Sequence, residues 1–151
     1  FDEIKLKVNK RLISIGRLDF NSEGLLLLTN NGDFARKLEL PQNKFQRTYK
    51  VRIFGIINNK IKDQLKNGIK VNSIKYKPID FELEDEKGKN RWLTMRLYEG
   101  KNREIRKIMD HFGCTVNRLI RISYGPFNLK DLKPGQLTEL KYKNFNKLLK
   151  S

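Results

Sequence analysis

The sequence predicts an α+β fold, in which a mostly antiparallel mixed sheet is flanked by short helices. Segments that alternate apolar and polar residues, as half-buried strands do, outnumber segments with helical spacing. The links between them are too short for the repeated crossover helices that parallel strands need. The 151 residues suit one domain, and an apolar content of 38% is enough for a core.

Near the N-terminus we expect one strand and one helix. The apolar run Leu25–Thr29 is typical of a buried strand, and Asn31-Gly32 then signals a turn. Asp33 is expected to cap a helix over Phe34–Leu40. Pro41 ends that helix because proline lacks the backbone N–H.

The middle of the chain predicts a strand and then a helix. Residues Tyr49–Phe54 alternate apolar and basic side chains, as a half-buried strand does. A helix begins at Asn58, buries Ile61 and Leu65, and ends at Asn67-Gly68.

The second half begins with Ile74–Leu83, which we interpret as a strand or a hairpin arm, and a turn over Glu84–Asn90. Trp92–Tyr98 alternates again and predicts another strand. A helix over Asn102–Phe112 follows, because Ile105, Ile108, Met109 and Phe112 recur at helical spacing. The last predicted elements are strands at Val116–Ser123 and Leu137–Leu140 and a short helix with Phe145, Leu148 and Leu149.

The charge of the chain is the first indication of function. Lys and Arg number 33 and Asp and Glu 17, which leaves a net charge of +16. Such a protein attracts polyanions, of which nucleic acid is the commonest. The alternative interpretation is a Lys-rich surface that serves solubility alone.

Cysteine and histidine are too few for several classes of chemistry. Cys114 stands alone and cannot form an internal disulfide, which fits a reducing cytoplasm, where we expect the protein to act. With His111 as the other N/S ligand, a zinc site of the usual type is not expected, and His111 is interpreted as a surface residue. We therefore expect neither a metal nor a histidine base. No apolar run has the length of a membrane helix, and no signal peptide is visible.

Two loops carry candidate site residues. In Gly16–Gly24, Asp19 lies beside Arg17 and could act as a nucleophile or base, or simply form a turn. Glu23 could pair with Asp19 as the carboxylates of glycosidases do. The segment Glu99–Lys107 places a glycine and several cations at a helix start, which either binds anions or forms a solvated helix face.

Four segments, taken in order, resemble the pseudouridine synthases, and among them the branch that modifies small- and large-subunit ribosomal RNA. They are Gly16–Asp19 with Ser22–Asn30, Arg47–Val51, Glu99–Lys107, and Arg118–Arg121 with Tyr124-Gly125. The resemblance covers roughly residues 11 to 142. Asn90-Arg91-Trp92 favours the branch of the large-subunit synthase B.

The resemblance implies that a uridine of ribosomal RNA, in the large subunit, is isomerised to pseudouridine without a cofactor. Asp19 would be the essential carboxylate, which attacks C1′, attacks C6 or removes a ribose proton. Tyr49 would stack on the extruded uracil and help remove its C5 proton. Arg106 would form an ion pair with Asp19. We expect the three to converge in one cleft.

The same resemblance implies contacts to RNA from cations near this cleft. Arg17 is the candidate that holds the displaced backbone. The other expected RNA contacts are Lys101, Asn102, Arg103, Lys107, Arg118 and Arg121, with one arginine of the pair 118 and 121 on each face of its strand. The expected partner is ribosomal RNA or an assembly intermediate, with no membrane, and the protein is expected to be a monomer.

By the same resemblance, residues 1–151 form a catalytic domain that lacks its first strand and a preceding RNA-binding domain. A different class of function stays open: a non-catalytic basic domain that binds RNA or assists ribosome assembly. A nuclease ranks last, because the sequence has neither a pair of histidines nor a carboxylate cluster for metals.

Overall fold

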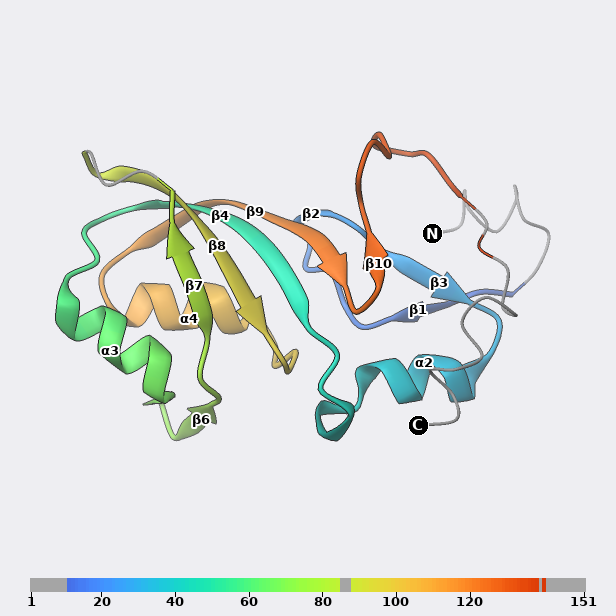
Figure 1. Ribbon diagram of the computed structural model, residues 1–151, viewed down its shortest axis with the longest axis horizontal. Coiled ribbons are helices and arrows are strands. Elements are labelled where there is room, and N and C mark those ends of the chain that lie inside the picture. The colour runs from blue at the N-terminus through green and yellow to red at the C-terminus, as the bar shows by residue number, and fades with distance from the viewer. Residues whose placement is uncertain (1–10, 85–87, 139, 141–151) are drawn as a thin grey trace.

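The computed structural model describes residues 11–84, 88–138 and 140, and a mixed sheet of six strands runs through its centre (Figure 1). Five strands lie in the antiparallel order β10 (Phe127–Asn128), β9 (Thr115–Tyr124), β4 (Arg47–Phe54), β8 (Asn90–Leu97) and β7 (Asp80–Leu83). The short strand β2 (Glu23–Gly24) joins β9 in parallel. The predicted α+β class with a mostly antiparallel sheet is confirmed.

Two small antiparallel sheets and three α-helices complete the described part of the fold. The small sheets pair β1 (Ile13–Ile15) with β3 (Leu27–Thr29), and β5 (Ile69–Val71) with β6 (Ile74–Tyr76). The helices are α2 (Gly32–Glu39), α3 (Asn59–Asn67) and α4 (Glu104–His111), and a 3-10 turn, η1 (Pro41–Asn43), follows α2. No helix in residues 11–84 or 88–138 has the length and apolar character needed to cross a membrane.

The protein has two apolar cores. The larger core fills the space between the sheet and the helices α3 and α4, which cover the same face (Figure 1). The smaller core surrounds α2, with Ile15, Phe34 and Leu38 packed against Tyr124 at the end of β9. Strand β9 therefore contributes to both cores.

Several elements follow the sequence closely. The side chain of Asn58 accepts a hydrogen bond from the Ile61 N–H at 2.9 Å, and α3 ends at Gly68, whose φ is 87°. In β4, Val51 and Ile53 are fully buried while Arg52 is exposed. These predictions are confirmed because caps and strand alternation are local properties of the chain.

Other boundaries differ from the predictions. The cap of α2 is Asn31, which accepts a hydrogen bond from the Phe34 N–H at 3.1 Å, so Asp33 lies in the first turn instead. The run Leu25–Thr29 is not one strand: Leu25 turns into the smaller core between β2 and β3. The segment Ile74–Leu83 is divided by Pro78, so that β6 pairs with β5 and β7 pairs with β8.

The predicted elements near the C-terminus are either absent or lie outside the described residues. Leu137, Thr138 and Leu140 lie in no strand, and the two leucines are 46% and 52% exposed, because no strand among the described residues pairs with them. The strand after β9 is β10 instead, which follows the turn at Gly125. The helix predicted around Phe145, Leu148 and Leu149 lies outside the described residues, as does the middle of the predicted turn Glu84–Asn90.

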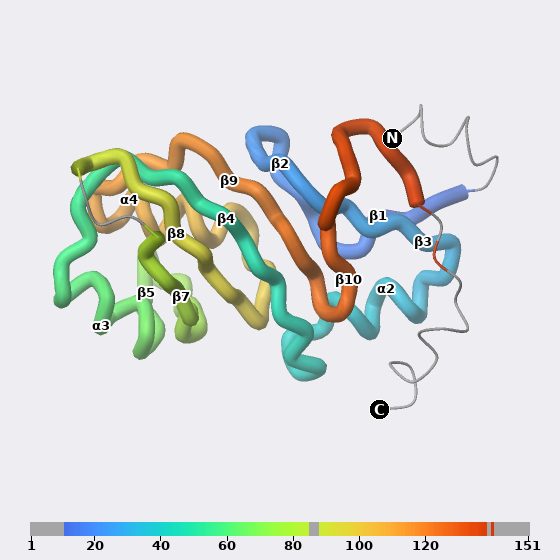
Figure 2. The backbone as a smooth tube through the Cα atoms, turned by 45° about the horizontal axis from the view of Figure 1, so that its top comes forward, coloured from blue at the N-terminus to red at the C-terminus, as the bar shows by residue number. Residues whose placement is uncertain are grey.

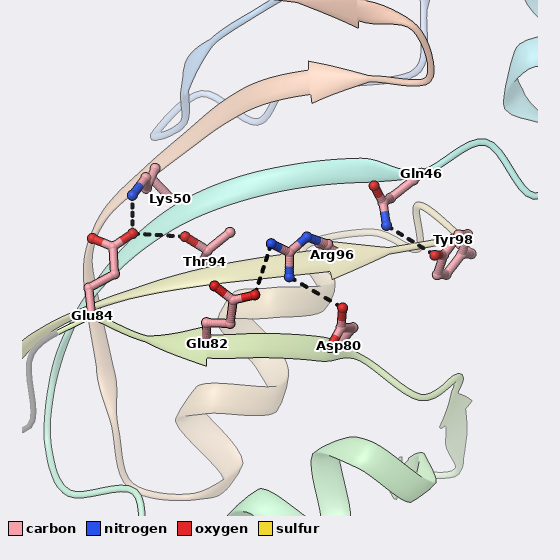
Figure 3. A network of polar contacts seen from close by, with 8 residues as sticks. All are labelled: Gln46, Lys50, Asp80, Glu82, Glu84, Thr94, Arg96 and Tyr98. Carbon is pink, nitrogen blue, oxygen red and sulfur yellow. Dashed lines mark hydrogen bonds and ion pairs between the residues drawn. The ribbon is translucent and has the colours of Figure 1, made fainter.

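The face of the sheet opposite the larger core carries matched charges (Figure 3). Lys50 contacts Glu84, which also accepts a hydrogen bond from Thr94 at 2.8 Å. Arg96 lies 3.2 Å from both Asp80 and Glu82. Acidic side chains from β7 and the residue that follows it thus neutralise cations of β4 and β8 on this face.

Candidate active site

A cavity of about 120 Å³ lies where the loop after β1 meets the start of α4. Asp19 and Ser22 line it from the loop, Tyr49 lines it from β4, and the segment Glu99–Ile105 lines its other side. Two of the three predicted catalytic residues, Asp19 and Tyr49, therefore face one cavity although they are distant in sequence.

A tight turn presents Asp19. The main-chain carbonyl of Asp19 accepts a hydrogen bond from the Ser22 N–H at 2.9 Å, which places Phe20 and Asn21 at the tip. The Asp19 carboxylate is not needed for this bond, so it is left available for chemistry.

Arg121 ties the two ends of this loop together. Its Nη1 donates to the Arg17 carbonyl at 3.2 Å and its Nε to the Leu25 carbonyl at 2.9 Å, while its own carbonyl accepts from the Leu25 N–H at 2.8 Å. A Cβ on Gly24 would lie 2.2 Å from the Arg121 carbonyl oxygen, so this close approach requires glycine. Figure 2 shows the segment at β2 running beside β9.

The predicted RNA contact from Arg121 is wrong, because the residue is only 1% exposed and its guanidinium binds the loop. Arg118 lies on the opposite, exposed face of β9, as predicted. There it forms a bidentate ion pair with Glu23 at 2.8 and 3.0 Å, which lowers the pKa of Glu23 and raises that of Arg118. Glu23 is thus engaged by Arg118, and no contact joins its carboxylate to that of Asp19.

A stack of two arginines around Tyr124 connects this loop to β4. The guanidinium groups of Arg47 and Arg121 lie 4.6 and 5.3 Å from the centre of the Tyr124 ring. The Tyr124 hydroxyl accepts a hydrogen bond from Arg47 at 2.7 Å and donates to the Leu38 carbonyl at 2.9 Å. Because Arg47 precedes Tyr49 on the same strand, the stack helps set the position of Tyr49 relative to the loop.

This role of Arg47 and Tyr124 was not predicted from the sequence, although both residues belong to the matching segments. Burial raises the pKa of the Tyr124 phenol against the opposing charge of Arg47, so this hydroxyl stays protonated at neutral pH. The signal that could have identified Arg47 is its strand register: Val51 and Ile53 at the same alternate positions are buried.

Arg106 approaches the loop from behind the cavity. Its Nη2 donates to the Asn21 carbonyl at 2.7 Å and its Nη1 to the Val116 carbonyl at 3.3 Å. These two carbonyls hold the guanidinium, and among the described residues Arg106 forms no direct ion pair with the Asp19 carboxylate, so this prediction is wrong. Burial and the charge of Arg103 lower the pKa of Arg106, and the charge of Asp19 opposes that shift. Asp19 is therefore near enough to influence Arg106.

Most of the predicted RNA-contacting residues lie at the cavity or beside it. Arg17, Lys101, Asn102 and Arg103 line the cavity, and Lys107 lies in an adjoining hollow that Arg103 and Arg106 also line. Lys101 contacts the Lys75 carbonyl, and its Nζ lies 5.5 Å from the centre of the Tyr76 ring. The cations at the cavity mouth can meet an anionic ligand, whereas Arg118 lies away from this cavity.

Two buried carboxyl groups line the cavity opposite Asp19. Glu99 accepts a hydrogen bond from the Lys77 N–H at 2.8 Å, and its other oxygen lies 3.5 Å from the Lys101 ammonium. Glu104 accepts a bond from the Lys101 N–H at 3.3 Å, but its Oε2 has no hydrogen-bond partner among the described residues. Burial, reinforced by the charge of Glu99, raises the pKa of Glu104 to about 8. Glu104 is therefore largely protonated at neutral pH.

This raised pKa predicts how stability depends on pH. Folded Glu104 keeps its proton between its ordinary pKa of 4.5 and about 8, whereas the unfolded chain releases it. The free energy of unfolding should therefore fall as pH rises through this window, by at most about 1.4 kcal/mol per pH unit. Glu104→Gln should lack this contribution, so the stability difference between wild type and variant should change steadily in urea unfolding at pH 5, 6.5 and 8.

Glu23→Gln is the matched control for this experiment. The pKa of Glu23 is lowered rather than raised, so its contribution is lost only in acid, below the tested window. Its stability difference from wild type should be constant from pH 5 to 8. A constant difference for Glu104→Gln as well would show that Glu104 is ionised in the folded protein.

Comparisons with known proteins show which family this chain is similar to. The family model described as RNA pseudouridylate synthase matches residues 1–111. A protein of Rickettsia bellii, named an uncharacterized RNA pseudouridine synthase, is 52% identical over 86% of this chain and 56% of its own length. The ribosomal large subunit pseudouridine synthase B of Buchnera aphidicola subsp. Acyrthosiphon pisum is 45% identical over 98% of this chain and 60% of its own.

Solved structures show the same fold. A crystal structure of a pseudouridylate synthase matches with a TM-score of 0.80 and 25% identity, over 91% of this chain and 59% of that protein. An archaeal box H/ACA ribonucleoprotein shares the fold with a TM-score of 0.64 at 19% identity. The chain spans somewhat more than half the length of the curated relatives it matches.

Proposed function

This chain belongs to the RNA pseudouridylate synthase family, and from that premise we propose that it isomerises a uridine of large-subunit ribosomal RNA to pseudouridine. The observation that carries the proposal is the meeting of Asp19 and Tyr49 in one cavity with cations at its mouth. The large-subunit assignment is supported by the 45% identity to a relative named large subunit pseudouridine synthase B.

The reaction exchanges an N–C glycosidic bond for a C–C bond and moves one proton from C5 to N1, without an oxidant and without a group that leaves the nucleotide. The N1–C1′ bond of uridine breaks, the uracil rotates, and C5 bonds to C1′; C5 then loses its proton, and N1 ends protonated. Asp19 supplies the carboxylate that starts this sequence, by attack at C1′, by attack at C6, or by removing a ribose proton. A bond to C1′ breaks when C5 attacks that carbon, a bond to C6 breaks by elimination, and a proton taken from the ribose is returned to it, so the carboxylate is regenerated. The cavity keeps the freed uracil beside the ribose while it turns.

Tyr49 and Arg106 support this chemistry in different ways. Tyr49 stacks on the extruded uracil and helps remove the C5 proton after the new bond forms. Arg106 holds the Asn21 carbonyl beside Asp19, and its guanidinium lies near enough for the charge of Asp19 to act on it. Arg106 thus acts on Asp19 through the loop rather than through a direct ion pair.

The cations at the cavity mouth bind the phosphates of the RNA. Arg17 holds the backbone displaced when the uridine is extruded, while Lys101, Asn102, Arg103 and Lys107 contact neighbouring phosphates and sugars. These contacts supply affinity and register rather than choice of sequence. We propose that the protein acts on its RNA in the cytoplasm, as a monomer, through this catalytic domain.

The function is tested by mapping pseudouridine in ribosomal RNA from a strain that lacks the gene. We expect one or a few uridines of the large-subunit RNA to stay unmodified and to be modified again when the gene is restored. Loss of pseudouridine from small-subunit RNA alone would contradict the assigned subunit. An unchanged map would favour the alternative, a non-catalytic RNA-binding or ribosome-assembly domain.

Phosphate contacts also predict how binding depends on salt. The logarithm of the association constant should fall linearly with the logarithm of salt concentration, and loss of one contact should reduce the slope by about one. We expect this for Lys101→Ala and for Arg103→Asn; asparagine is chosen because Arg103 has a φ of 51°. Filter binding of an rRNA fragment at several salt concentrations measures the slopes.

Arg96→Ala is the control for the salt experiment. Arg96 lies on the opposite face of the sheet between Asp80 and Glu82, so its removal should leave the slope unchanged (Figure 3). Equal slopes for all three variants and wild type would mean that the cavity mouth does not bind phosphates.

A further inference from the structure

Phe20, at the tip of the Asp19 turn, is the most exposed apolar side chain among the described residues. Its side chain is 100% exposed, whereas Phe34 and Phe127 are buried in the smaller core. Single exposed apolar residues are ordinary on protein surfaces. Phe20 differs by its place, since it directly follows Asp19, which lines the candidate active site, although Phe20 itself does not line it.

The turn that carries Phe20 is held firmly. The Asp19 carbonyl and the Ser22 N–H close it, and Arg106 holds the Asn21 carbonyl at 2.7 Å. Arg121 fixes the base of the loop through the carbonyls of Arg17 and Leu25. The aromatic ring is thus carried on an ordered support, so little backbone freedom would be lost when a ligand covers it.

The position of Phe20 fits a base that has left the stack. A uridine that enters the cavity leaves an empty place between its two neighbours in the RNA, and unstacking costs free energy. Asp19 and Ser22, on either side of the tip of the turn, line the cavity, whereas the fully exposed Phe20 does not line it and is free to contact RNA next to the target nucleotide. With Asp19 at the ribose of the target, the ring of Phe20 can reach the vacated place.

We propose that Phe20 inserts into the RNA base stack at the position that the target uridine leaves, and so holds the uridine in its extruded form. This inference rests on the proposed function and names the residue that stabilises the extruded state. An aromatic ring stacks on any base, because every base presents a π-face. Insertion of apolar side chains between base steps is a known way to keep a nucleic acid distorted.

The charges around the turn fit the same partner. Arg17 and Arg103 line the cavity next to Asp19 and can bind the phosphates on either side of the extruded nucleotide. A nucleic acid strand offers phosphates to these cations and base faces to the ring. A protein partner that covered Phe20 would instead need acidic groups at each of these positions.

The test compares two rRNA hairpins that differ only at the target nucleotide. In one the target uridine is paired, and in the other it faces a mismatch, which makes extrusion easier. The whole protein is used as wild type, Phe20→Ala, Phe20→Trp and Ile56→Ala, and single-turnover formation of pseudouridine is measured. Ile56 is the control because it is 58% exposed but lines neither the cavity nor the adjoining hollow.

We expect Phe20→Ala to be at least about tenfold slower than wild type on the paired hairpin, as loss of one stacked aromatic ring predicts. On the mismatched hairpin its loss should be less than about threefold. Phe20→Trp should retain the wild-type rate on both hairpins, and Ile56→Ala should match wild type throughout. An equal loss on both hairpins, or no loss on either, would overturn the proposal.

Two further measurements distinguish a failure of the inference about Phe20 from a failure of the proposed function. The melting temperature of Phe20→Ala should equal that of wild type, and a clear drop would show that Phe20 is covered by another part of the protein, which overturns the inference. If wild type forms no pseudouridine on either hairpin, the proposed function fails, and the role of Phe20 is decided by affinity. Phe20→Ala should then bind about tenfold more weakly with an unchanged salt slope; wild-type affinity would refute stacking.

Discussion

Replacing Asp19 by asparagine is expected to abolish formation of pseudouridine while the fold and the affinity for RNA are retained. The amide can neither attack the ribose or base nor remove a proton, so the rate should fall by at least about 10³-fold. The turn should persist, because it uses the main-chain carbonyl of Asp19 and not the carboxylate. Removing one negative charge beside the cations should leave RNA binding unchanged or slightly stronger.

Three measurements on this variant separate a catalytic Asp19 from a turn residue. They are the single-turnover rate, the affinity for an rRNA fragment and the melting temperature. If Asp19 only stabilises the turn, Asp19→Asn should lower the melting temperature modestly and keep its activity. Asp33→Asn is a suitable control, since Asp33 lies exposed in the first turn of α2, away from the cavity.

Arg121→Met is expected to lower the turnover rate about 100-fold without a comparable loss of RNA affinity. Arg121 is almost fully buried and holds both ends of the loop that carries Asp19, and a displacement of about 1 Å in a reacting group can lower the rate by this factor. Loss of two hydrogen bonds from a charged donor should also lower the free energy of unfolding, by about 3 kcal/mol. Because Arg121 positions Asp19 and does not contact RNA, the substitution should lower kcat and leave KM nearly unchanged.

Arg118→Met provides the matched control on the same strand. Arg118 is exposed and paired with Glu23 at the surface, so its loss should change stability little and leave kcat unchanged. If Arg121→Met folds too poorly for assay, Arg121→Lys can still donate to one of the two carbonyls and should give an intermediate kcat. Loss of RNA affinity with unchanged kcat in the Arg121 variants would contradict the positioning role.

The sequence was informative where structure depends on neighbours along the chain. The caps of α3 at Asn58 and Gly68 and the alternation of Val51 and Ile53 in β4 are local patterns, and both are confirmed. The strand predicted at Leu137–Leu140 is not seen at residues 137, 138 and 140, because a short segment with two leucines does not indicate whether a partner strand lies beside it. The split at Pro78 follows from the pairing of β6 and β7 with different neighbours.

For the candidate site, the matching segments correctly predicted that Asp19 and Tyr49 lie close together, since both line one cavity. The roles of the arginines could not be predicted, because they depend on the folded structure. Strand alternation separates Arg118 from Arg121 but does not tell which of them the loop covers. The contact of Arg106 with the Asn21 carbonyl instead of the Asp19 carboxylate depends on side-chain geometry. The raised pKa of Glu104 depends on burial that only the folded chain creates.

The central claim is that this cavity breaks and remakes the glycosidic bond of a uridine, with Asp19 as the essential group. It is tested most directly by release of tritium from ribosomal RNA labelled at uracil C5, since C5 loses its hydrogen only when the new carbon–carbon bond is completed. We expect the whole protein to release tritium from large-subunit RNA and Asp19→Asn to release none above background. Equal release by both proteins, or no release by wild type from any ribosomal RNA that it binds, would contradict the account.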